Sequence, residues 1–99
     1  MSSRPLVDRL VWDDWNRHHV ARHAVLPEEA EEVVAGEPVV RATYKQRLLF
    51  IGPTLARRML TVVMGPVPNA PGVYYVFSAR PASRQERRYY EQQQGGIEP

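Results

Sequence analysis

The 99-residue chain contains no cysteine. It therefore has no disulfide, no zinc site built from thiolates and no cysteine nucleophile. Long apolar runs are also missing, because the longest stretches, residues 48–51 and 59–64, are far shorter than the roughly 20 residues that cross a bilayer. The opening segment MSSRPLVDRL has too little apolar character for a signal peptide. We expect a cytoplasmic protein that does not span a membrane.

Acidic residues are scarce in the second half of the chain. Residues 41–90 contain eight Arg and one Lys but a single Glu, which gives this segment a net charge of +8. Residues 1–40 carry four Arg against three Asp and five Glu, a net charge of −4, so the overall charge of +2 conceals two halves of opposite sign. Arginine binds phosphate oxygens through paired hydrogen bonds and stacks on planar rings. The basic half predicts contact with a polyanion.

The composition fits one globular domain with a modest core, since 43% of the residues are hydrophobic and 24% are charged. Hydrophobic periodicity and a Ser83–Glu86 capping box predict strands at residues 10–12, 39–43, 47–51, 58–64 and 73–79, and helices at 14–23, 27–35 and 83–93, the second of which Gly36 stops. Short links favour antiparallel pairing. We predict an α+β fold with a mostly antiparallel four-stranded sheet, a short N-terminal strand, two N-terminal helices and one C-terminal helix. Residues 1–9 are expected to be an N-terminal extension, residues 10–91 the domain and residues 92–99 a polar, frayed tail.

Two residue pairs near the N-terminus have the residue types of a metal site and of a base-stacking site. A structural role explains both pairs better. His19 and His23 have the four-residue spacing of a two-histidine metal half-site, yet no third ligand accompanies them. We therefore expect no metal site. Trp12 and Trp15 are expected in the core rather than at a base-stacking surface.

Several short motifs between about Leu10 and Tyr90 resemble, in their order and spacing, the BrnT-type toxin family. They are Trp12-Asp13, Asn16, His23 followed by Val25, the helix Glu28 to Val33, Arg47 ahead of Phe50-Ile51-Gly52, the strand Leu60 to Val63, Ser78-Ala79-Arg80, and Glu86-Arg87-Arg88 with Tyr90. The resemblance implies a small bacterial ribonuclease toxin with a RelE-like fold. It also implies a partner, a BrnA-like DNA-binding antitoxin that neutralises the toxin in a hetero-oligomer and helps to repress their operon.

The resemblance further implies site residues. Arg47, Arg80 and Arg87 match a basic cluster on the sheet and C-terminal helix of family members. His23 matches the histidine of a Lys-His or Arg-His pair in the N-terminal part of family members. Relatives often carry additional arginines near the end of a central strand and before the Ser-Ala-Arg triplet, and an acidic residue where this chain has Gln46. Because of these departures, the alternative stays open that this protein is a descendant of the family that binds its targets without cleaving them.

Cleavage of RNA without a metal ion needs a base for the ribose 2′-hydroxyl, an acid for the leaving oxygen and fixed positive charge at the phosphorus. Arginine supplies only the third, because it stays protonated. Proton transfer therefore falls first to His23, with Glu86 and Tyr90 as further candidates. The candidate catalytic residues are His23, Arg47, Arg80 and Arg87, and the candidate RNA-binding residues are Arg84, Arg88, Tyr75 and Tyr90. No cofactor is expected.

Structural explanations stay open for two of these candidates. An unpaired charge at the end of a buried strand costs on the order of several kcal/mol, so Arg80 could be a scaffold residue paired with Asp13 or Glu86. His23 could be a hydrogen-bonding helix-end residue that ties the N-terminal helices to the sheet. The predicted function is a metal-independent endoribonuclease toxin that cleaves cellular RNA and inhibits translation. The alternative is a non-catalytic module that binds protein or nucleic acid.

One of two adjacent tyrosines is expected beside the arginines. Alternation along the last strand sends Tyr74 and Tyr75 to opposite faces of the sheet. One of them can then pack inward while the other stacks on a nucleobase.

Overall fold

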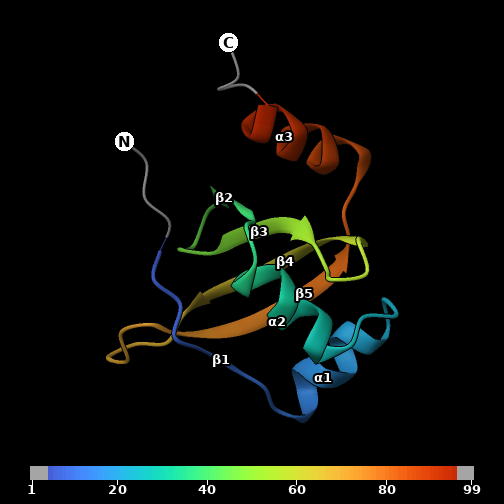
Figure 1. Ribbon diagram of the computed structural model, residues 1–99. Coiled ribbons are helices and arrows are strands. Elements are labelled where there is room, and N and C mark those ends of the chain that lie inside the picture. The colour runs from blue at the N-terminus through green and yellow to red at the C-terminus, as the bar shows by residue number, and fades with distance from the viewer. Residues whose placement is uncertain (1–4, 96–99) are drawn as a thin grey trace.

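The computed structural model describes residues 5–95 and has a five-stranded sheet between helices (Figure 1). The elements in chain order are β1 (Arg9–Val11), α1 (Asp14–Ala21), α2 (Pro27–Ala35), β2 (Val39–Ala42), β3 (Leu48–Pro53), β4 (Met59–Pro66), β5 (Val73–Pro81) and α3 (Arg84–Gly95). The predicted α+β class and the predicted order of elements are confirmed. No helix within residues 5–95 has the length and apolar composition needed to cross a membrane.

The strands lie in the order β1-β5-β4-β3-β2. Strands β2 to β5 form the predicted antiparallel meander. Strand β1 runs parallel to β5, where Arg9 pairs with Val73 and Val11 pairs with Tyr75. The short first strand therefore joins the sheet at the edge formed by β5 and lies beside the beginning of that strand.

Asp13 and Asn16 begin helix α1 with reciprocal hydrogen bonds. Oδ1 of Asp13 accepts from the backbone N–H of Asn16 (2.9 Å), and Oδ1 of Asn16 accepts from the N–H of Asp13 (2.8 Å). The buried Asn16 amide also donates to the carbonyls of Val11 (2.9 Å) and Val76 (3.0 Å). These bonds satisfy a buried polar group and fix the start of α1 to strands β1 and β5.

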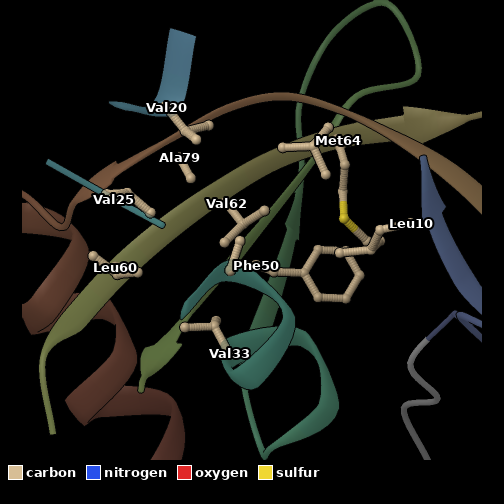
Figure 2. Close-up of a cluster of buried hydrophobic side chains, with 11 residues drawn as sticks. Leu10, Val20, Val25, Val33, Phe50, Leu60, Val62, Met64 and Ala79 are labelled. Atoms are coloured by element: carbon tan, nitrogen blue, oxygen red, sulfur yellow. The ribbon is translucent and has the colours of Figure 1, made fainter. Parts of the chain in front are cut away.

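The hydrophobic core lies between the sheet and the layer formed by α1 and α2 (Figure 2). Phe50 of β3 and Val62 of β4 are buried against Val20 of α1 and Val33 of α2. Because side chains alternate along a strand, these residues mark one face of the sheet as the core face. Removal of this apolar surface from water is the main force that holds the two helices to the sheet.

The prediction that both tryptophans enter the core was wrong for Trp15, which is 58% exposed. Its ring stacks on that of His19 with the centroids 4.8 Å apart. The inward positions of α1 are occupied instead by Asn16 and Val20. Trp12 is half-buried against the core, and its Nε1 donates to a glutamate of α2 (2.9 Å).

Two helix ends differ from the predicted ones. Helix α1 ends at Ala21 rather than at His23, because the chain turns through Ala24, whose φ is 59°. Helix α3 continues to Gly95, so that residues 92–95 of the expected tail are helical. The remaining tail residues 96–99 and the first four residues of the expected N-terminal extension lie outside the described residues.

Candidate nucleic-acid interface

The face of the sheet that points away from α1 and α2 carries the candidate arginines. Alternation places on this face the neighbours of the core residues, among them Thr61 of β4 and its pairing partner Arg80 of β5. Helix α3 covers part of the face through contacts with β2 and β3 (Figure 1). We call this surface the arginine face and define it by Arg41, Arg47, Thr61, Tyr75, Phe77 and Arg80.

Arg47 reaches the arginine face directly after a tight turn between β2 and β3. Lys45 and Gln46 both have a φ of 61°, as the two central residues of a type I′ turn do. The N–H of Arg47 donates to the carbonyl of Tyr44 (3.3 Å), and the carbonyl of Arg47 accepts from the N–H of Thr43 (2.9 Å). Positive φ costs a non-glycine residue roughly 1–2 kcal/mol. The turn therefore fixes the backbone of Arg47 at a local cost in stability.

Phe77 projects from an irregularity in the pairing of β4 with β5. Val63 pairs with Ser78 and Met64 pairs with Val76, so Phe77 has no paired residue on β4. Such a β-bulge bends the strand and redirects its side chain. It also places Val76 and Ala79, three residues apart, on the core face together.

The ring of Phe77 lies over Gly65 and beneath Arg47. A Cβ atom added at Gly65 would lie 3.1 Å from Cε2 of Phe77, so a side chain there would require the ring to move by a few tenths of an ångström. The guanidinium carbon of Arg47 is 4.1 Å from the ring centroid, which is within cation–π distance. No carboxylate within residues 5–95 forms an ion pair with Arg47. The ring therefore orients a half-buried cation whose charge is not neutralised by an acidic side chain.

Tyr75 extends this row of side chains to the start of α1. Its ring meets that of Phe77 edge to face at 5.2 Å, and its hydroxyl donates to Oδ1 (3.1 Å) and Oδ2 (3.0 Å) of Asp13. The backbone N–H of Asn16 is the main cause of the lowered pKa of Asp13, while burial and the bond to Asp13 raise the pKa of Tyr75. Tyr74 packs against the core on the opposite face, so the predicted separation of the two tyrosines is confirmed.

Arg80 is held by Glu86 at the other end of the arginine face. Its Nη1 and Nη2 atoms donate to Oε1 and Oε2 of Glu86 (2.7 and 2.8 Å). Oε1 also accepts from the Thr61 hydroxyl and the Ser83 N–H (both 2.8 Å). Burial alone would raise the pKa of Glu86, but these hydrogen bonds outweigh it and lower the pKa from 4.5 to about 2. The scaffold partner foreseen for Arg80 is thus Glu86, and Asp13 binds Tyr75 instead.

Arg47 and Arg80 occupy separate parts of the arginine face. Arg80 pairs with Thr61, whereas the ring beneath Arg47 covers Gly65, four residues further along β4. At about 3.3 Å per residue, these two positions on β4 lie roughly 13 Å apart. The two guanidinium groups therefore face different partners, one an aromatic ring and the other a carboxylate.

Helix α3 supplies further cations. Arg84, Arg87 and Arg88 are exposed and line a surface hollow together with Glu91. Their side chains are free to extend into solvent, so they are suited to contact a long polyanion rather than to hold one phosphate in a fixed geometry.

Two tyrosines of α3 lie in different environments. The Tyr89 ring centroid is 5.1 Å from the guanidinium carbon of Arg41, which connects α3 to β2. Tyr90 is half-buried and lines a separate hollow with Glu37 and Leu55, at the C-terminal end of α2 and the turn after β3. The structure therefore does not bring Tyr90 to the arginine face.

His23 lies on the side of the sheet that α1 covers. It is exposed, its ring meets that of His19 at 5.8 Å, and its backbone carbonyl accepts from Arg58 (3.4 Å). The structure does not bring it into contact with Arg47 or Arg80. Among residues 5–95 no three or more His, Cys, Asp or Glu side chains are grouped so that they could hold a metal ion.

Sequence reasoning missed Phe77, Gly65 and Arg41. The spacing of two residues between Tyr75 and Phe77 was a usable signal, because residues i and i+2 share a sheet face. The bulge and the close approach of Phe77 to Gly65 depend on the pairing of distant strands and leave no local pattern.

Comparison with known proteins finds a solved structure with a similar fold. No protein-family model and no curated protein matches the sequence. The structure is similar to the 1.1 Å crystal structure of BrnT, the ribonuclease toxin of Brucella abortus, with 25% sequence identity and a TM-score of 0.61, over 77% of this chain and 97% of that chain. The chain has a BrnT-type fold. The resemblance of its motifs to BrnT-type toxins is confirmed, and the BrnT-type fold carries the arginine face on the side of its sheet opposite α1 and α2.

Proposed function

We propose that this protein is a BrnT-type endoribonuclease, the toxin of a toxin–antitoxin pair, which cleaves cellular RNA without a metal ion and thereby inhibits translation. The observation that carries the proposal is the state of Arg47, which is half-buried, oriented by Phe77 and not paired with a carboxylate within residues 5–95. A cation fixed in this way is a preorganised ligand for a phosphate. The similar fold of a ribonuclease toxin supports the same chemistry.

The arginines take different roles in this proposal. Arg47 binds the scissile phosphate and stabilises the negative charge that grows as the ribose 2′-hydroxyl attacks the phosphorus. The exposed arginines of α3, Arg84, Arg87 and Arg88, bind the flanking phosphates, and Tyr75 offers a ring to a base. Arg80 holds α3 to the sheet through its ion pair with Glu86, which neutralises its charge.

The groups near Arg47 are poorly suited to transfer protons at neutral pH. The titratable groups in the row that ends at Arg47 are Tyr75, whose pKa is raised, and Asp13, whose pKa is lowered. Neither is matched to neutral pH, where a general base or acid is most effective. We therefore propose a slow enzyme that depends mainly on charge stabilisation.

The decisive assay uses the purified chain, free of any partner, with single-stranded RNA in excess EDTA. Attack by the 2′-hydroxyl gives fragments that end in a 2′,3′-cyclic phosphate and a 5′-hydroxyl, which mass spectrometry identifies. Arg47→Ala protein, purified in the same way, controls for a contaminating nuclease. Intact RNA in every reaction would contradict the proposal.

A second function, RNA binding without cleavage, is favoured by two observations. Arg80 already has a carboxylate partner, and His23 is separated from the arginine face. Retention of RNA in a binding assay, combined with intact RNA in the cleavage assay, would assign this function instead.

His23→Ala is expected to change the cleavage rate by less than about threefold. A general base must approach the proton it takes to about 3 Å, and His23 lies on the opposite side of the sheet from Arg47. The measurement is the cleavage rate of both proteins between pH 5 and 8. A large loss that removes a titration near neutral pH would restore His23 as the proton-transfer group.

We expect an antitoxin to bind over β5 and α3. An acidic segment of the partner would pair with the exposed arginines of α3, and apolar anchors would supply affinity. Co-expression with the adjacent small gene should yield a complex whose amide exchange is slowed within Val73–Pro81 and Arg84–Gly95. Slowed exchange confined to residues 28–37 would place the partner on the acidic helix α2 instead.

A further inference from the structure

Phe77 lies between Arg47 and Tyr75 in the row of side chains that crosses the arginine face. Arg47 lies over its ring at 4.1 Å, and Tyr75 meets its edge at 5.2 Å. Tyr75 is in turn bonded to Asp13, which begins α1. The ring therefore connects a cation at the β2–β3 turn to the rigid start of a helix.

Three features of the fold place this ring: the bulge in β5, the glycine at position 65 and the ring of Tyr75. The bulge removes Phe77 from the strand pairing, and Gly65 opens the space over β4 into which the ring extends. Tyr75 then holds the edge of the ring. Phe77 stays half-buried on the arginine face, whereas the core face of the same sheet is filled by other residues, including Phe50.

Arg47 has few other means of orientation. No carboxylate within residues 5–95 pairs with it, so the side-chain direction rests on the ring below it. A long, flexible arginine side chain loses much rotamer entropy when it binds a phosphate, and prior orientation reduces that loss. The ring face also attracts the guanidinium directly.

We propose that Phe77 is a positioning residue that holds Arg47 in the orientation in which it binds the scissile phosphate of RNA. The assignment deepens the proposed function and rests on it for the RNA-based measurements. Phe77 acts through Arg47 and does not itself touch the reacting atoms.

A double-mutant cycle tests this assignment with a single-stranded RNA that carries a 2′-deoxy sugar at the cleavage position and so is bound but not cleaved. Phe77→Leu is expected to weaken binding by about 3- to 10-fold, the worth of a partly buried cation–π contact. In the Arg47→Ala background the same change should have almost no effect, because the group that it positions is gone. Equal effects in both backgrounds would overturn the proposal.

Three further variants separate positioning from general damage to the fold. Phe77→Tyr keeps the ring and should restore binding and cleavage to within about twofold of the original protein. Gly65→Ala places a methyl group against the ring, displaces it by a few tenths of an ångström and should weaken binding less than Phe77→Leu does. Phe50→Leu makes the same chemical change in the core and should lower stability while leaving the cycle unchanged.

A measurement that needs no RNA keeps this inference distinct from the proposed function. The protons of the Arg47 side chain should be shifted upfield in the NMR spectrum by the ring current of Phe77, and the shift should vanish in Phe77→Leu. If the protein neither binds nor cleaves RNA but the shift is present, the proposed function fails and the orientation of Arg47 by Phe77 stands. If the shift is absent, Phe77 does not orient Arg47, whatever the RNA assays give.

Discussion

Arg47→Ala is expected to lower the rate of RNA cleavage by about 100-fold or more, as does removal of one preorganised donor from a transition-state site. Arg47 has this importance because it is half-buried, lies on Phe77 and has no carboxylate partner within residues 5–95. The measurement is single-turnover cleavage of a short RNA at saturating protein. Arg47→Lys keeps the charge but loses the planar guanidinium group. Its cleavage rate should therefore fall between the rates of the original protein and of Arg47→Ala.

A matched control removes the same charge from the other side of the molecule. Arg22 is exposed at the C-terminal end of α1 and lines a hollow with Trp15 and His19 of the same helix. Arg22→Ala should therefore slow cleavage by less than about threefold, through the small change in overall charge. If both alanine variants cleave equally well, Arg47 has no special role and non-specific attraction accounts for RNA contact.

The second large effect concerns the bond between Glu86 and Arg80. Glu86→Gln is expected to lower the free energy of unfolding by about 1–2 kcal/mol at pH 7, after allowance for the 35% exposure of the Arg80 side chain. The change removes the carboxylate that pairs with Arg80 and that also accepts from Thr61 and Ser83. In a domain of this size, each kcal/mol corresponds to about 4–8 °C in Tm. Urea unfolding gives the measurement.

The pH dependence of the free energy of unfolding tests the role of the same carboxylate, that of Glu86. The pKa of Glu86 is about 2 in the folded protein against an ordinary value of 4.5, so its contribution to stability is complete above about pH 4.5 and is lost as the pH falls toward 2. Glu86→Gln should flatten this part of the stability profile. Glu91→Gln, at an exposed position further along α3, should leave the profile unchanged. Parallel profiles for all three proteins would show that Glu86 is not the stabilising carboxylate.

The sequence predicts the elements of this fold better than its site. The capping box at Ser83 and Glu86 and the split between Tyr74 and Tyr75 depend on residues close together in the chain, and both were predicted. The bulge at Phe77 depends on which residues of β4 and β5 pair, which is decided by packing across the whole sheet.

The two arginine candidates illustrate the same limit. In the sequence Arg47 and Arg80 are similar members of one basic segment. In the structure Arg80 is paired with the carboxylate of Glu86, whereas Arg47 lies on the ring of Phe77. This difference decides their proposed roles, and it depends on side chains, Glu86 and Phe77, whose positions the local pattern does not give.

The parallel pairing of β1 with β5 delays assembly of the site during synthesis. Residues 9–11 lie beside residues 73–75, and the bond from Tyr75 to Asp13 joins the same two segments. At about 5–20 residues per second, β5 leaves the ribosome roughly 3–13 s after β1. Tyr75 and Phe77 emerge only after strands β1 to β4, and the arginines of α3 emerge later still, so a nascent chain that lacks β5 has no complete arginine face. The proposed RNA-binding surface is therefore completed only after β5 and α3 have been synthesised.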